Sequence, residues 1–204
     1  MVKKMKIEEM IIAVQKKLGV DIDGRAGPET WTAIYSNIIG TVPKDFSIDK
    51  VDDRSEENII TLLPEVQPYA RALVQNAAKL GITIKVISAF RSYAEQDALY
   101  NIGRTVEPHR SPVTNAKGGY SNHNFGTAFD IGIFEGKKYL TDSSKYNAIG
   151  ALGLELGLEW GGKWTSFVDK PHFQLRPYWA IDISQTEMLA EFRKRIKQGT
   201  PLFT

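Results

Sequence analysis

The feature of this sequence that most restricts its fold is a charged residue inside a short apolar strand. Residues 127–133 read Thr-Ala-Phe-Asp-Ile-Gly-Ile, and successive side chains of a strand point to opposite faces of a sheet. One face then carries large apolar groups, whereas the other places Asp130 between Ala128 and Gly132. Because a buried carboxylate is costly without a partner, Asp130 requires a cation, and its small neighbours leave space for one.

Composition narrows the chemistry that can surround Asp130. The chain of 204 residues has no cysteine, which excludes disulfides, cysteine-ligated metals and a cysteine nucleophile. Any histidine-based site must use His109, His123 or His172, because the chain has 3 histidines. With 26 basic and 24 acidic side chains the net charge is +2, which is too balanced for a protein that binds nucleic acid by neutralising many phosphates.

Two of the histidines stand where they can meet Asp130. His123 lies shortly before Asp130 at the end of a glycine-rich loop, and His172 begins a second apolar segment. Two histidines and one carboxylate supply three zinc ligands and leave a fourth position for water, which is the arrangement of a catalytic zinc site. We therefore predict that His123, Asp130 and His172 bind zinc. His109 is expected to be exposed in its loop and to take no part in the site.

Two further charged residues complete the candidate site. Asp169 precedes His172 across a turn that Pro171 stiffens, and a carboxylate beside a zinc-activated water can act as its general base. Arg91 follows the predicted buried strand 82–88 and precedes a helix cap. Its guanidinium can therefore bind a carboxylate or stabilise an oxyanion.

Each candidate also has a purely structural interpretation. The histidines can be hydrogen-bonded core residues, Asp130 can be an ion-pair partner of Arg91, and Asp169 can cap a turn. Taken singly, the structural interpretation is favoured for each residue. Their joint position at breaks between apolar strands favours a functional site instead.

The rest of the chain predicts an α+β fold, in which helices flank a small antiparallel sheet that holds the zinc. Apolar spacing and capping signals predict the helices, and short apolar runs predict the strands. The predicted helices cover residues 7–18, 28–35, 65–80, 92–102, 143–157 and a final segment from 184 onward. The predicted strands cover residues 82–88, 125–134, 158–160 and 172–175, and residues 103–122 form a long loop.

Changes in composition along the chain predict two domains. Residues 1–40 form a small helical module, residues 41–57 a polar linker without apolar periodicity, and residues 58–204 the domain that holds the zinc. No apolar run is long enough to span a bilayer, and the lysine-rich start lacks the apolar stretch of a signal peptide. We therefore expect neither membrane insertion nor a secretory signal.

Several motifs stand in a characteristic order over more than half of the chain. They include Arg91-Ser92, Ser121-x-His123-x-x-Gly126-x-Ala128-x-Asp130, Glu159-Trp160-Gly161-Gly162 and Asp169-x-x-His172. In this order they resemble the zinc-dependent peptidoglycan peptidases of the D-alanyl-D-alanine carboxypeptidase and L-alanyl-D-glutamate endopeptidase superfamily. The likeness runs from about residue 53 to residue 177, and words such as Glu159-Trp160-Gly161-Gly162 favour the L-alanyl-D-glutamate branch, which includes phage endolysins.

The resemblance implies a role for each candidate residue. Asp169 becomes the general base and Arg91 the clamp for substrate and transition state, while Ser121 contacts the substrate or the metal ligands. Carboxypeptidases and D,D-dipeptidases of the superfamily commonly carry glutamate where Asp169 stands, so the shorter side chain favours the endopeptidase branch. The implied zinc ligands are His123, Asp130 and His172.

The activity implied by the resemblance is hydrolysis of the L-alanyl-D-glutamate bond in the stem peptides of bacterial peptidoglycan. The alternatives are a D-alanyl-D-alanine carboxypeptidase and a non-catalytic peptidoglycan-binding protein with a structural zinc. Asp169 argues against the last alternative, because a structural site does not use a base beside the metal. The family likeness further implies a monomer that is made in the cytoplasm and reaches the cell wall through a phage holin.

The front of the chain resembles a second kind of module. Residues 14–20 and 23–34 are similar to peptidoglycan-binding modules, which are usually small three-helix bundles. About two helices fit into residues 1–40, near the lower limit for independent folding, so we expect a shortened module or one that docks on the catalytic domain. Trp31 is interpreted as a core aromatic residue, with stacking on a glycan as the alternative.

Overall fold

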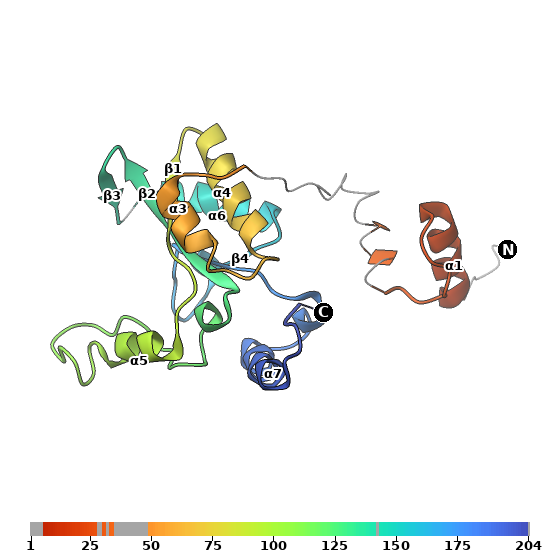
Figure 1. Ribbon diagram of the computed structural model, residues 1–204. Coiled ribbons are helices and arrows are strands. Elements are labelled where there is room, and N and C mark those ends of the chain that lie inside the picture. Colours follow the sequence, from red (N-terminus) through yellow and green to blue (C-terminus); the bar gives the residue numbers. More distant parts are fainter. Residues whose placement is uncertain (1–5, 28–29, 32, 35–48, 142, 204) are drawn as a thin grey trace. The chain divides into compact units, whose positions relative to one another are not determined.

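A computed structural model describes residues 6–27, 30–31, 33–34, 49–141 and 143–203 (Figure 1). Contacts within the chain group residues 1–46 into one unit and residues 47–204 into a second. Within the described ranges, no helix combines the length and the apolar character that crossing a membrane requires.

The first unit contains helix α1 (Ile7–Leu18), which confirms the helix predicted over the same residues. It ends at Gly19, whose φ of 70° is the left-handed conformation that glycine adopts without strain. Thr30, Trp31, Ala33 and Ile34 are helical, and the other residues of the second predicted helix lie outside the described residues.

Gln15 is the polar centre of this unit and is almost fully buried. Its Nε2 donates to Asp23 Oδ1 at 2.7 Å, to the Arg25 carbonyl at 2.9 Å and to Thr30 Oγ1 at 3.0 Å. The Gly24 N–H donates to Gln15 Oε1 at 3.0 Å. The Gln15 side chain thus fastens the bend at Asp23 and Gly24 to α1.

The second unit is built on an antiparallel sheet of five strands, as predicted for the fold class. Along the sheet the order is β1 (Thr83–Ser88), β2 (Ala128–Glu135), β5 (His172–Gln174) and β4 (Glu159–Trp160). A further strand, β3 (Lys138–Leu140), pairs with the far end of β2.

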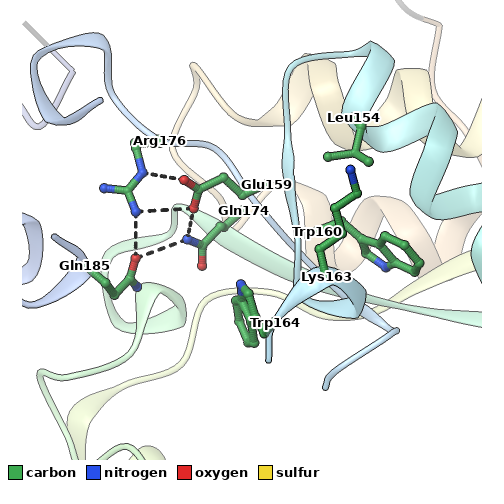
Figure 2. A pocket seen from close by; sticks show the side chains of 8 residues that line it. All are labelled: Leu154, Glu159, Trp160, Lys163, Trp164, Gln174, Arg176 and Gln185. Atoms are coloured by element: carbon green, nitrogen blue, oxygen red, sulfur yellow. Dashed lines mark hydrogen bonds and ion pairs between the residues drawn. The ribbon is translucent and has the colours of Figure 1, made fainter. Parts of the chain in front are cut away.

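Strands β4 and β5 pair so that Glu159 lies opposite Gln174. Gln174 Nε2 donates to the Glu159 carboxylate across this pair (Figure 2). Both strands match their predicted positions. The short β3 was not predicted, because three residues are too few to show an apolar alternation. Its pairing with β2, which a sequence does not show, holds it in place.

Strand β2 begins later than predicted. The sequence predicts a strand from Phe125, but residues Asn122–Phe125 form the 3₁₀ helix η1. Gly126 ends η1 with a φ of 66°, and the strand starts at Ala128. The apolar side chain of Phe125 does not extend the sheet, because it packs in a separate cluster with Phe192.

The helices that accompany the sheet agree with the sequence in most places. Helices α5 and α7 begin where the sequence predicts, each with a capping box, formed by Ser92 with Glu95 and by Ser184 with Glu187. The α-helices are α3 (Asp53–Ile59), α4 (Gln67–Lys79), α5 (Tyr93–Asn101), α6 (Lys145–Glu155) and α7 (Gln185–Gln198). Short 3₁₀ helices also occur at η2 (Gly161–Lys163) and η3 (Tyr178–Ala180).

Helix α3 begins inside the segment that composition assigns to the linker, residues 41–57. The buried Ile59 and two polar contacts hold it against the rest of the second unit, and so short a helix has little apolar periodicity to indicate it. The Val86 N–H donates to the buried Ser55 hydroxyl at 3.0 Å, and the Arg71 guanidinium pairs with Glu56 at 2.7 Å.

The core lies on the predicted apolar face of β2. Phe129, Ile131 and Ile133 are fully buried and pack with Leu73 of α4 and Ile149 of α6. Since side chains alternate along the strand, Asp130 points to the other face. The packing of helices on one face thus leaves the opposite face free to hold polar side chains.

Candidate metal centre

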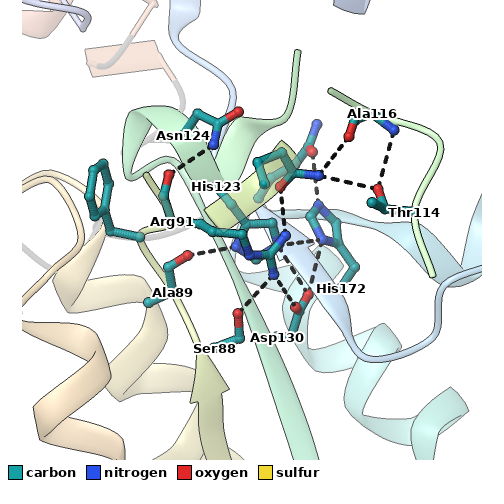
Figure 3. A network of polar contacts seen from close by, with 12 residues as sticks. Ser88, Ala89, Arg91, Thr114, Ala116, His123, Asn124, Asp130 and His172 are labelled. Atoms are coloured by element: carbon teal, nitrogen blue, oxygen red, sulfur yellow. Dashed lines mark hydrogen bonds and ion pairs between the residues drawn. The ribbon is translucent and has the colours of Figure 1, made fainter. Parts of the chain in front are cut away.

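Three side chains from different elements meet on this polar face (Figure 3). Asp130 of β2 and His172 of β5 are cross-strand partners, and His123 comes from η1. Asp130 Oδ1 lies 3.1 Å from His172 Nδ1 and 3.3 Å from His123 Nε2. The two ring nitrogens are 3.3 Å apart. The structure therefore brings together the three side chains predicted to bind zinc.

Each imidazole has an inner nitrogen that faces the cluster and an outer nitrogen that faces away from it. A hydrogen-bond acceptor next to the outer nitrogen orients each ring. His123 Nδ1 lies 2.7 Å from the Ala89 carbonyl, and His172 Nε2 lies 3.0 Å from Gln174 Oε1. Gln174 is itself fixed, because its Nε2 donates to Glu159. Since carbonyl oxygens only accept, the outer nitrogens of the neutral rings carry the protons and the inner nitrogens present lone pairs.

The donor set fits a zinc ion. Two nitrogen lone pairs and a carboxylate oxygen converge on one point, and these groups attract a cation. Ligand atoms at 2.0–2.1 Å from a tetrahedral zinc are separated by about 3.3 Å. The ligand atoms His123 Nε2, Asp130 Oδ1 and His172 Nδ1 are 3.1–3.3 Å apart, so the cluster matches this spacing.

Electrostatics favour an ionised carboxylate in the cluster. Burial by itself raises the pKa of Asp130, but the charge and hydrogen bond of His123, followed by those of His172, outweigh burial and hold this pKa well below its usual range. Burial by itself lowers the pKa of His172, yet its hydrogen bond with Asp130 raises this pKa above the usual value. Without a bound cation, the cluster therefore attracts protons.

Asp169 lines the same cleft, on the turn before β5. Burial raises the pKa of its carboxyl group, and the neighbouring Asp130 carboxylate raises it further. The backbone of the turn is anchored, because the Asp169 N–H donates to the Gly161 carbonyl at 3.0 Å and the His172 N–H donates to the Asp169 carbonyl at 3.2 Å. A Cβ on Gly161 would lie 2.5 Å from the Asp169 carbonyl oxygen, so this contact requires glycine.

Arg91 lies beside the cluster, in the segment between β1 and α5. Its Nη1 donates to Gln96 Oε1 at 2.7 Å, and its Nη2 donates to Ser88 Oγ at 3.1 Å. The same Nη2 is 3.8 Å from Asp130 Oδ2, so the ion pair that the structural interpretation predicted is present. The side chain nevertheless keeps 18% of its surface exposed and lines the cleft, where it can also contact a substrate.

The cleft has a volume of about 390 Å³ and collects every predicted site residue. Its lining includes Arg91, Ser121, His123, Asp130, Asp169 and His172. Three partly exposed aromatic side chains, Tyr120, Trp164 and Phe167, also border it. His109 is exposed in its loop and is not among these lining residues, as predicted.

Sequence reasoning assigned no role to the residues that orient the ligands. Gln174 follows His172 by two residues in a predicted strand, and this spacing, which puts both side chains on one face, is the signal for their contact. Asn122 donates to the same Gln174 oxygen, and Gln96 holds Arg91. These last contacts join segments far apart in the sequence, and no local pattern announces them.

Comparisons with known proteins show which proteins the chain resembles. Residues 114–175 match a family model described as D-alanyl-D-alanine carboxypeptidase. The chain is 36% identical over 128 residues to the peptidoglycan L-alanyl-D-glutamate endopeptidase CwlK of Bacillus subtilis. The aligned region covers 57% of this chain and 74% of CwlK. The chain is also 30% identical over 126 residues to the L-alanyl-D-glutamate peptidase of Listeria phage A118. This aligned region covers 59% of this chain and 40% of the phage protein.

One solved structure was also aligned with the chain. The L-Ala D-Glu endopeptidase ChiX of Serratia marcescens aligns with a TM-score of 0.48 and 25% identity. The alignment covers 65% of this chain and 94% of ChiX.

Proposed function

Because the chain belongs to the family of peptidoglycan L-alanyl-D-glutamate endopeptidases, we propose that it is a zinc-dependent hydrolase of peptidoglycan stem peptides. The bond cut is the amide between L-alanine and D-glutamate, as the names of both curated relatives state for those proteins. The observation that carries this proposal is the His123–Asp130–His172 cluster, which lies beside Asp169 in one cleft.

The zinc ligands in this proposal are His123, Asp130 and His172. Zinc bound there polarises the scissile carbonyl and lowers the pKa of a water molecule. The hydrogen bonds from the outer ring nitrogens to Ala89 and Gln174 keep both inner nitrogens directed at the ion.

Asp169 is the proposed general base. Its carboxylate accepts a proton from the attacking water and then donates this proton to the amine of the leaving D-glutamate. The raised pKa supports this role, because a carboxylate with a higher pKa is a stronger base. The Gly161 contact supports it also, since it fixes the turn that carries Asp169.

Arg91 is the proposed clamp for the oxygen that gains negative charge during hydrolysis. Its guanidinium already lies in the cleft and is held by Ser88 and Gln96, so little reorganisation is needed when a substrate binds. Ser121 borders the same cleft and is proposed to contact the substrate.

The family model description supports a second candidate activity, removal of the terminal D-alanine by a carboxypeptidase. Digestion of purified peptidoglycan followed by mass spectrometry separates the two activities. We expect new peptides that begin with D-glutamate. Loss of terminal D-alanine without such peptides would replace the proposed bond with the carboxypeptidase bond.

Residues 1–40 are proposed to bind the cell wall, because their sequence resembles peptidoglycan-binding modules. Trp31 is 48% exposed, which leaves its ring available for a ligand. Sedimentation with insoluble peptidoglycan tests this role, and we expect Trp31→Ala to reduce the bound fraction of the full chain. Equal binding by Trp31→Ala and the unchanged protein would contradict a contribution from this ring.

The monomeric state and the release through a phage holin are also proposed, from the endolysin resemblance. Light scattering tests the first. Expression in host cells with and without a holin tests the second, and lysis that is equally fast without a holin would contradict it.

A further inference from the structure

A second pocket, shown in Figure 2, shares lining residues with the metal cleft. Its volume is about 510 Å³, within the range of small-molecule sites. Trp164, Gln174 and Gln185 line both this pocket and the cleft, so a ligand can extend from one into the other. The proposed reaction uses none of the side chains that line this pocket alone.

One side of the pocket is a network of planar polar groups. Arg176 Nε donates to the Glu159 carboxylate, and Arg176 Nη2 donates to Gln185 Oε1 at 3.2 Å. Gln174 Nε2 donates to the same Gln185 oxygen at 3.2 Å. The network fixes the orientation of these groups, and the Nε2 of Gln185 stays available as a donor because its oxygen takes both of these bonds.

The other side of the pocket is apolar and largely aromatic. It contains Trp164, which is 36% exposed, together with Trp160 and the side chain of Leu154. Lys163 lies at this side and forms no ion pair within the described part of the chain, so its ammonium group can donate to a ligand.

Such a pair of surfaces matches a pyranose ring. A pyranose has C–H groups on its faces, which are attracted to the electron-rich face of an aromatic ring, and hydroxyl groups at its edge. Amide and guanidinium groups in fixed orientations can bind these hydroxyls. A stem-peptide carboxylate would have to compete with Glu159 for the Arg176 guanidinium, because these two side chains already form an ion pair.

The pocket also lies at the right place for a sugar. Gln174 Oε1 is 3.0 Å from His172 Nε2, and the Trp164 ring centre is 4.9 Å from that of His172. One extended residue spans about 3.3–3.6 Å. In peptidoglycan, L-alanine is the single residue between the proposed scissile bond and the lactyl group of N-acetylmuramic acid. We propose that this second pocket binds the N-acetylmuramic acid ring, an inference that rests on the proposed function.

The test compares two soluble substrates that differ by the sugar alone. One is a disaccharide that carries the stem tripeptide on N-acetylmuramic acid, and the other is the same tripeptide capped with lactate. The measured quantity is the ratio of kcat/KM for the disaccharide substrate to kcat/KM for the lactyl peptide. We expect a ratio of about tenfold or more, from the stacked ring and its hydrogen bonds.

Two variants should remove this preference from opposite sides of the pocket. Trp164→Ala and Gln185→Ala are each expected to bring the ratio close to one. The matched control is Phe167→Ala, which removes a partly exposed aromatic ring of the metal cleft that does not line the second pocket. This control can lower kcat/KM for both substrates, but the ratio should stay unchanged.

A binding measurement gives a readout that does not depend on cleavage. The free disaccharide is titrated into ¹⁵N-labelled protein, whose 4 tryptophans give separate indole N–H signals. Loss of one signal in Trp164→Phe assigns the Trp164 resonance. We expect the disaccharide to shift this resonance.

The possible results separate the sugar site from the proposed function. Cleavage of both substrates with a ratio near one in the unchanged protein would overturn the sugar site and leave the proposed function intact. An equal fall of the ratio in Phe167→Ala would place the sugar elsewhere. If neither substrate is cleaved, the proposed function fails, and the titration alone decides whether the pocket binds the sugar.

Discussion

Asp130 and His172 stand directly opposite each other on neighbouring antiparallel strands, with Oδ1 and Nδ1 3.1 Å apart. The backbone pairing of β2 with β5 therefore sets the distance between two of the proposed metal ligands. The third ligand, His123, is tied to the same region by its backbone, since the Arg91 N–H donates to the His123 carbonyl at 3.0 Å. The sheet thus sets the positions of two ligands, and a backbone hydrogen bond outside the sheet anchors the third.

Removal of one histidine ligand should remove the metal. His172→Ala leaves two protein ligands, which hold zinc poorly, so we expect bound zinc and peptidase activity to be lost together. Metal analysis of the purified variant measures the zinc. His109→Ala is the matched control, because His109 is exposed outside the cleft, and it should keep both properties. Stoichiometric zinc in His172→Ala would exclude His172 from the ligand set.

The two carboxylates of the cleft should respond differently to substitution. Asp130→Ala is expected to lose zinc. Asp169→Ala is expected to keep zinc, but its kcat should fall by a factor of about 10²–10⁴ because the general base is removed. Zinc content and kcat, measured on the same preparations, decide between the roles. If Asp169→Ala loses zinc and Asp130→Ala keeps it, the assignments are reversed.

Arg91 should act mainly on the transition state. Arg91→Ala is expected to lower kcat with little change in KM, by an amount equal to about 2–4 kcal/mol, as for the loss of one oxyanion donor. Arg91→Lys should recover part of this loss, since an ammonium group cannot reproduce the planar guanidinium.

A thermal melt separates catalysis from stability in the Arg91 variant. Arg91 also holds Ser88 and Gln96, so its removal should lower Tm. A folded Arg91→Ala protein with full activity and a lowered Tm would reduce Arg91 to a structural role.

Removal of zinc should make stability depend on pH. In the metal-free protein the pKa of His172 is raised by Asp130, so its stabilising contribution is present below the unfolded pKa of about 6.5 and is lost as pH rises through the folded pKa. Tm of chelator-treated protein should therefore fall above about pH 6.5. Zinc-loaded protein binds neutral imidazole and should not show this fall. Parallel Tm curves for the two forms would contradict the coupling.

Gln15 should control the order of the first unit. Gln15→Ala removes the acceptor of the Gly24 N–H and three further hydrogen bonds, so we expect the Gly24 amide to lose its protection from hydrogen exchange. Amides of β2 should keep their protection, because they belong to the second unit. Lys16→Ala, an exposed change on the same helix, is the control and should leave Gly24 protected.

Local patterns account for the parts of the fold and site that the sequence predicted. The alternation along β2 identified both its apolar face and the position of Asp130. The capping boxes at Ser92 and Ser184 marked helix starts, because each is formed by residues three positions apart. These features arise from residues that are close together in the chain, so they can be predicted from the sequence.

Contacts between distant segments account for what was not predicted. The 3₁₀ helix at residues Asn122–Phe125 forms where the loop turns His123 toward Ala89 and Arg91. The link from His172 through Gln174 to Glu159 depends on the pairing of β4 with β5. The spacing of His172 and Gln174 indicates only their own contact, whereas the 3₁₀ helix and the contact of Gln174 with Glu159 have no signature in composition or spacing.

The polar attachment of α3 sets the point at which this enzyme can be recombined with other modules. A hybrid lysin joined at residue 58, the boundary that composition suggests, would discard Ser55 and Glu56. The Val86 amide would lose its acceptor, and Arg71, whose side chain is 16% exposed, would lose its ion-pair partner. Both losses remove polar contacts that hold the start of the second unit to β1 and α4. A crossover placed before residue 49 retains α3 and avoids these losses.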